Sequence, residues 1–181
     1  MAQIIELKVR TGLDYLSQFV KRGKNLRPVL KEIGEDLAES SKQRFATGTD
    51  PDGQAWAPNS AATLARYSPK FKRKKDGSLT KPSATKLANK KPGTGETGSL
   101  KTTINYQVYG DSLVGIGSPM VYASTFQFGA KSGEFGFGMY ATRKGSFPIP
   151  WGDIPARQFL GMSAADKANV VELVRSYMLE G

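Results

Sequence analysis

The feature that most limits the fold of this chain is an apolar stripe that begins at Leu26 and ends abruptly after Phe45. Large apolar residues recur about every 3.6 positions along it, which predicts one long helix with a single buried face. Pro28 suits the first turn of such a helix. The tetrapeptide DPDG at 50–53 is a strong turn signal, so the helix should end shortly beyond Phe45.

Trp56 follows that turn, and we expect it to bring the chain back to the core. Tryptophan is highly buried on average. We therefore favour Phe45 and Trp56 as structural anchors, with a direct ligand-binding role for Trp56 as the alternative. Residues 60–67 then predict a short helix capped by Asn59 or Ser60.

The remaining patterns predict both strands and helices. Residues 3–10 alternate apolar and charged side chains like a half-buried strand, and the apolar spacing over 13–20 predicts a short helix. Residues 98–117 predict an antiparallel hairpin that turns at 110–112. Residues 119–129 favour a short helix ended by glycine, with a strand as the second choice.

The last segment of the chain predicts a helix of about four turns. Ser163 and Asp166 resemble a capping box, with aspartate where glutamate is usual. One apolar stripe follows: Val170, Val171, Val174, Tyr177 and Met178. The order of the elements predicts a single α+β domain over residues 1–181, in which helices pack on one face of an antiparallel sheet instead of alternating with the strands.

Composition narrows the classes of function. The 181 residues include no cysteine and no histidine. Disulfides, thiolate nucleophiles, zinc sites built from Cys or His, and histidine acid–base chemistry are therefore excluded. No pair of carboxylates has a recognisable metal-binding or glycosidase spacing, so we expect neither an enzyme nor a cofactor. No apolar run approaches the roughly 18 residues of a membrane span, and we expect no membrane partner.

A basic insertion occupies residues 68–96, where nine Lys or Arg residues stand against Asp76 and Glu96. Such a composition buries too little apolar surface to offset its ordering entropy, so we expect a flexible loop that is mobile or ordered by a partner. The run KRKK at 72–75 is either part of a solvated loop or a surface that attracts polyanions. On the second interpretation, the candidate residues facing DNA or a channel lumen are Lys70, Lys72, Arg73, Lys74 and Lys75.

A second unusual segment, residues 129–152, is rich in both glycine and aromatic residues. Loops rarely expose so many aromatic side chains, so we expect this segment to bury them against a partner. The candidate residues of a subunit interface are Phe135, Phe137, Tyr140, Phe147 and Trp151.

Five motifs occur in a fixed order along the chain: RFATGTDPDGQAWAP at 44–58, SAATLARY at 60–67, TGSLKTTI at 97–104, GSPMVYASTFQFG at 117–129 and IPARQFLGMSAAD at 154–166. In this order they resemble the phage virion morphogenesis family, also called tail completion proteins, of Mu-like and related tailed phages. The resemblance covers residues 28–179. Gln127 departs from the family pattern, in which histidine is frequent at this position, and we expect Gln127 to lie where partners make contact.

The resemblance implies a structural virion protein that completes or terminates the tail and helps to join head and tail. It implies a homo-oligomeric ring at the neck or tail end, with a hexamer as the expected form, assembled in the host cytoplasm and contacting other neck or tail proteins. The basic residues would then face an acidic partner or, without sequence preference, the genomic DNA in the channel. Charge alone leaves an alternative, a free protein that binds nucleic acid non-specifically.

Overall fold

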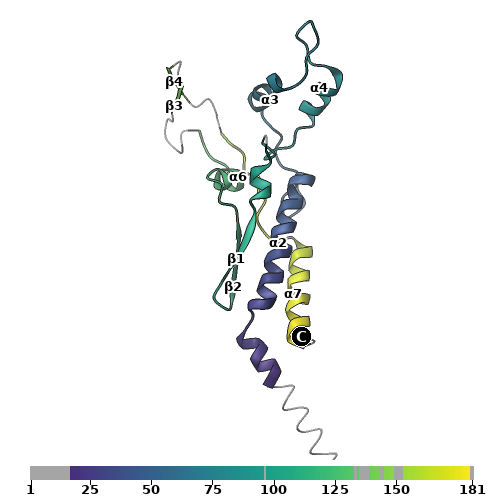
Figure 1. Ribbon diagram of the computed structural model, residues 1–181, viewed down its shortest axis with the longest axis vertical. Coiled ribbons are helices and arrows are strands. Elements are labelled where there is room, and N and C mark those ends of the chain that lie inside the picture. The colour runs from purple at the N-terminus through teal and green to yellow at the C-terminus, as the bar shows by residue number, and fades with distance from the viewer. Residues whose placement is uncertain are drawn as a thin grey trace, which may run out of the picture. The chain divides into compact units, whose positions relative to one another are not determined.

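The computed structural model of the 181-residue chain describes residues 17–95, 97–132, 134, 139–142, 145–148 and 153–179. Within this part the protein is α+β, with two antiparallel hairpins among the helices, which confirms the predicted fold class (Figure 1). The described chain divides into two compact units. The first contains residues 17–40, 104–117 and 162–179, and the second contains the rest. The strand predicted over 3–10 and the first part of the helix predicted over 13–20 lie outside the described residues, whereas residues 17–24 are helical.

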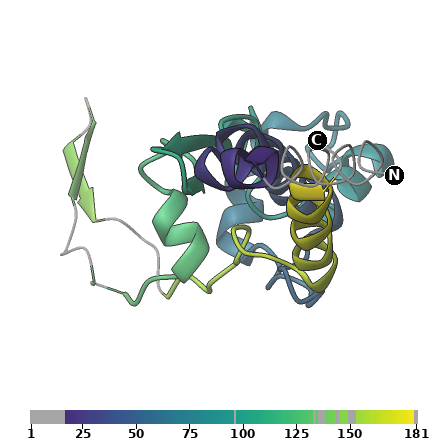
Figure 2. The same cartoon turned by 90° about the horizontal axis from the view of Figure 1, so that it is seen from below.

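The first unit is built around the N-terminal part of α2, Arg27–Thr47, the long helix that the apolar stripe predicted. The strands β1, Asn105–Tyr109, and β2, Leu113–Gly117, form a hairpin on one side of α2. The C-terminal helix α7, Ala164–Leu179, runs along the other side (Figure 1, Figure 2). The hairpin and α7 therefore flank α2 in this unit.

The core of the first unit is aliphatic. Val29, Ile33 and Leu37 of α2 are buried at its centre, each four residues after the one before, as one face of a helix requires. The half-buried residues that pack against them come from the residue before α2, from β2 and from α7: Leu26, Val114, Ile116, Val170, Leu173 and Tyr177. The hydrophobic effect thus fixes the hairpin and α7 to α2 through one small cluster.

The hairpin turns at 110–112, as the sequence predicted, and Tyr106 pairs with Ile116 across the strands. Its inner face meets α2 at Gly34, where a Cβ atom would collide with the ring of Tyr106. The Tyr106 hydroxyl also donates a hydrogen bond of 2.8 Å to the carboxylate of Glu35. The prediction was wrong at the start of this segment, where the short helix α5, Ser99–Thr102, precedes β1.

The helix α7 begins with the predicted capping box. The amide of Ser163 donates to Asp166 Oδ2 at 2.8 Å, and the amide of Asp166 donates to Ser163 Oγ at 3.1 Å. The apolar stripe predicted for α7 was wrong in part, because it included an exposed residue and left out one that packs on the core. Leu173, three residues after Val170, shares its face toward the core, whereas Val171 is 66% exposed on the adjacent face.

The second unit contains the end of α2 and several short elements. They are α3, Ala61–Tyr67; η1, Ser68–Lys70; α4, Lys81–Ala88; α5; α6, Ala123–Phe128; β3, Met139–Thr142; and β4, Gly145–Pro148. Ser60 caps α3 by accepting a hydrogen bond of 3.2 Å from the amide of Thr63, so the capping prediction is confirmed for Ser60. Helix α6 ends at Gly129, which confirms the helical prediction for this segment over the strand alternative.

The basic segment differs from the predicted loop because it contains regular structure. The helix α4 occupies its second half, and α3 and α4 pack together. Between them, Arg73 and Leu79 form an antiparallel bridge around a tight turn. Local hydrogen bonds, which composition alone does not report, provide this order.

Candidate functional site

The aromatic cluster of the second unit consists of Phe45, Trp56, Phe126 and Phe159. The ring of Phe45 lies 5.1 Å from that of Trp56 and 5.4 Å from that of Phe159, both edge to face. The ring of Phe126 stacks 5.7 Å from Phe45. Phe45, Trp56 and Phe159 are buried, as expected for the first two. The sequence did not predict that Phe126 and Phe159 belong to this cluster, although both lie in motifs that carry the family resemblance.

Gln127 connects the end of α6 to the segment that carries Phe159. Its Oε1 accepts hydrogen bonds from the amides of Phe159 and Leu160 at 2.9 and 3.0 Å, and its Nε2 donates to the Leu160 carbonyl at 3.0 Å. The side chain is buried. The expectation that Gln127 contacts a partner was therefore wrong, because its polar atoms bind the backbone of this chain.

Two arginines hold the same segment from other directions. Arg44, at the end of α2, donates to the carbonyls of Phe159 and Gly161 at 2.8 and 3.0 Å. Arg157 donates to the carbonyls of Ala57 and Pro58 at 2.7 and 2.9 Å. Burial lowers the pKa of Arg157. These guanidinium groups therefore act as cross-links between backbone segments that are far apart in the sequence.

A backbone bridge within the second unit closes the base of the segment 129–152. Ala130 and Ile154 exchange backbone hydrogen bonds of 2.8 and 2.9 Å, so these two residues lie side by side. Tyr140 of β3 pairs with Phe147 of β4 through the backbone. The other candidate interface residues, Phe135, Phe137 and Trp151, lie outside the described residues.

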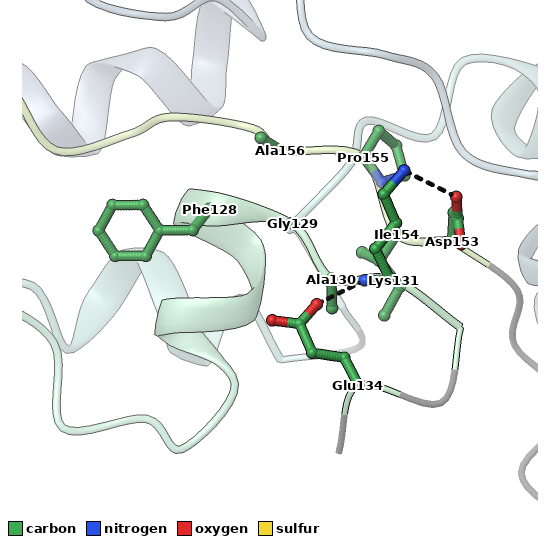
Figure 3. A pocket seen from close by; sticks show the side chains of 9 residues that line it. All are labelled: Phe128, Gly129, Ala130, Lys131, Glu134, Asp153, Ile154, Pro155 and Ala156. Carbon is green, nitrogen blue, oxygen red and sulfur yellow. Dashed lines mark hydrogen bonds and ion pairs between the residues drawn. The ribbon is translucent and has the colours of Figure 1, made fainter. Parts of the chain in front are cut away.

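An open cavity of about 530 Å³ lies at this base (Figure 3). It is lined by Phe128, Gly129, Ala130, Lys131, Glu134, Asp153, Ile154, Pro155 and Ala156. Lys131 Nζ lies 3.3 Å from Asp153 Oδ2, and the Lys131 amide donates to Glu134 Oε2 at 2.6 Å (Figure 3). The amide of Ser132 and then Lys131 lower the pKa of Asp153. Both carboxylates of the cavity are thus engaged in holding the local backbone.

The ends of α6 expose large apolar side chains. Val121 is 95% exposed and Phe128 is 75% exposed, and Tyr122, which follows Val121, is half exposed. Sequence reasoning missed this surface because the helical pattern of 119–129 does not show which apolar residues face the core. The signal that could have found it is an excess of apolar residues for so short a helix.

The five candidate cations of the basic segment lie at the end of η1 and in the turn that follows it. Lys70 ends η1, and the other four surround the bridge between Arg73 and Leu79. Lys72, Lys74 and Lys75 are exposed. The structure therefore brings these lysines together on one turn.

No group of three potential metal ligands occurs among the described residues. Nor does any helix in the described part of the chain have the length and apolar character to cross a membrane.

The sequence profile of the phage virion morphogenesis family matches residues 7–179, and the chain belongs to that family. It is therefore a phage protein with a structural or assembly role in the virion. No curated protein matches the chain significantly, and no solved structure does.

Proposed function

We propose that this protein completes or terminates the phage tail as a ring at the neck and helps to join head and tail. The family match across residues 7–179 carries the proposal. The protein acts by fit and not by catalysis, as a component of the virion that assembles in the host cytoplasm. Its partners are further copies of itself and other neck or tail proteins.

A closed ring requires two different patches on each subunit, one for each neighbour. The apolar surface at Val121, Tyr122 and Phe128 supports a role as one of them, because monomers rarely leave such side chains exposed together. The aromatic residues between Ala130 and Ile154 supply further candidates. We assign both sets to contact with a second copy of the chain.

The subunit mass in solution tests this assignment. We expect the wild-type protein to form a hexamer and the double variant Val121→Ser/Phe128→Ser to remain monomeric with an unchanged melting temperature. Val20→Ser/Val171→Ser is the matched control, since both of its valines are exposed in the first unit. A wild-type protein that is strictly monomeric and missing from purified virions would overturn the ring.

A free nucleic-acid-binding protein is the second candidate, favoured by the exposed lysines at 72, 74 and 75. It predicts that the isolated monomer binds DNA while virions lack the chain. Mass spectrometry of purified particles distinguishes the two functions.

A further inference from the structure

The basic arm, which we define as residues 68–91, has a local structure that backbone hydrogen bonds hold. The amide of Lys74 donates to the Ser78 carbonyl at 2.8 Å, and the amide of Thr80 donates to the Lys72 carbonyl at 3.2 Å. The amide of Gly77 closes the turn with a 3.0 Å hydrogen bond to the Lys74 carbonyl. The arm therefore presents Lys72, Lys74 and Lys75 on a defined turn.

Some cations of the arm are used inside the protein. Arg73 donates to the Gly77 carbonyl at 2.6 Å and to Ser68 Oγ at 2.9 Å. Lys90 Nζ lies 4.3 Å from the centre of the Tyr67 ring. Lys91 donates to the Ala46 carbonyl. These three cations hold the turn and the base of the arm.

Other cations of the arm have exposed ammonium groups. Within the described part of the chain, no side-chain hydrogen bond or ion pair engages the following residues: Lys72, Lys74, Lys75, Lys81 and Lys86. The arm's one acidic residue, Asp76, is occupied, since its Oδ1 accepts from the amide and hydroxyl of Ser78 at 2.8 and 2.7 Å. The exposed ammonium groups therefore dominate the field around the turn.

The composition of this surface favours binding to phosphate groups over binding to another protein. The centres of protein interfaces are depleted in lysine and enriched in aromatic residues. Phe71, the aromatic residue of the turn region, is only half exposed, so the arm lacks a row of rings on which single-stranded bases could stack. A dense group of ammonium ions without apolar surface suits the phosphates of a duplex, which bind without base readout.

We propose that the exposed lysines of the basic arm bind the phosphate backbone of duplex DNA, while Arg73, Lys90 and Lys91 hold the arm in shape. The inference rests on the proposed function only for the identity of that duplex as the phage genome in the channel. The binding itself is a property of the arm and requires no ring.

Salt-dependent binding to a short random-sequence duplex, measured by fluorescence anisotropy, tests the proposal. The triple variant Lys72→Gln/Lys74→Gln/Lys75→Gln should lower the salt slope of the binding constant by about 0.9 for each lost contact. The control Lys24→Gln/Lys31→Gln/Lys167→Gln removes the same charge from exposed positions in the first unit and should keep the wild-type slope. Equal loss in both triples, or a wild-type protein that binds no duplex at low salt, overturns the proposal.

A gain-of-affinity variant gives an independent test. Asp76→Asn retains the oxygen that accepts from Ser78 but removes the negative charge beside the lysines, so DNA affinity should rise. Asp111→Asn makes the same charge change on the exposed β1–β2 turn and should leave affinity unchanged. An Asp76→Asn protein that binds no more tightly than Asp111→Asn contradicts the assignment. Virions that contain the chain while it fails to bind DNA would sink this inference and leave the proposed function standing.

Discussion

The aromatic cluster and the basic arm belong to the same unit but use their side chains in opposite ways. In the cluster, the rings of Phe45, Trp56 and Phe159 are buried, and the side chains of Gln127 and Arg157 bind backbone groups. Among the described residues, no buried side-chain nitrogen or oxygen atom lacks a hydrogen-bond partner. The arm instead keeps most of its lysines in solvent.

This difference means that the cluster contributes to the stability of the unit and the exposed lysines of the arm contribute to binding. Burial of rings supplies the free energy that orders the second unit. Exposed lysines contribute little to that stability, because surface charges are well solvated. Substitutions in the cluster should therefore destabilise the protein, and substitutions of the arm's exposed lysines should change only its binding to partners.

The largest effect is expected from Phe159→Ala in the aromatic cluster. Phe159 is fully buried, so loss of its ring should reduce the free energy of unfolding by about 3–5 kcal/mol. Trp56→Ala should cost a similar amount. Urea denaturation measures both, with the exposed Phe128→Ala as the control. A loss below about 1 kcal/mol would show that the cluster does not hold the unit together.

A smaller effect is expected from Gln127→Met, which keeps the length of the side chain but removes its polar atoms. The buried amide of Phe159 and the amide of Leu160 would lose their acceptor, at a cost of about 2–4 kcal/mol. Gln107→Met on the exposed face of β1 should change stability by less than about 0.5 kcal/mol. Equal stability of the two variants would mean that Gln127 is not a structural connector.

Gly129→Ala tests the base of the segment that joins the cluster to the candidate interface. Gly129 has φ of +75°, and an added Cβ would lie 2.6 Å from the Ile154 carbonyl oxygen. We expect a loss of about 1–3 kcal/mol. Gly110→Ala, with φ of +61° but open space around it, should cost less. Thermal unfolding compares the two variants, and the reverse order would contradict the closed base.

The smallest effect concerns acid and the turn of the basic arm. The hydroxyl and amide of Ser78 lower the pKa of Asp76, so this carboxylate stabilises the turn above its unfolded pKa. That contribution is lost as the pH falls through the lowered pKa. Carboxyl NMR titration should show the pKa of Asp76 rising in Ser78→Ala. An unchanged titration would show that the hydroxyl does not order the turn.

Local patterns predicted much of the fold. The apolar stripe of α2, the β1–β2 turn and the capping box at Ser163 each depend on residues close in sequence, and each is present. The helix α4 was missed because composition suggested a loop, although Pro82 suits a first helical turn. Helical spacing also misassigned Val171, since the pattern alone did not show which of the adjacent residues Val170 and Val171 faces the core.

The candidate site was harder to predict because it depends on contacts between distant segments. Gln127 resembles any polar residue of a short helix until the backbone of Phe159 and Leu160 is placed beside it. Likewise, the run at 72–75 does not show that Arg73 serves the fold while its neighbours remain exposed. Charge density predicted where the basic surface lies, but it did not predict which cations bond within the protein and which remain exposed.

The most direct test of the proposed function is an image of purified virions in which this chain carries a label. We predict a closed ring of label density at the neck, where the head joins the tail. Label that is absent from the particles, or scattered along the tail or capsid, would contradict a role at the head–tail joint.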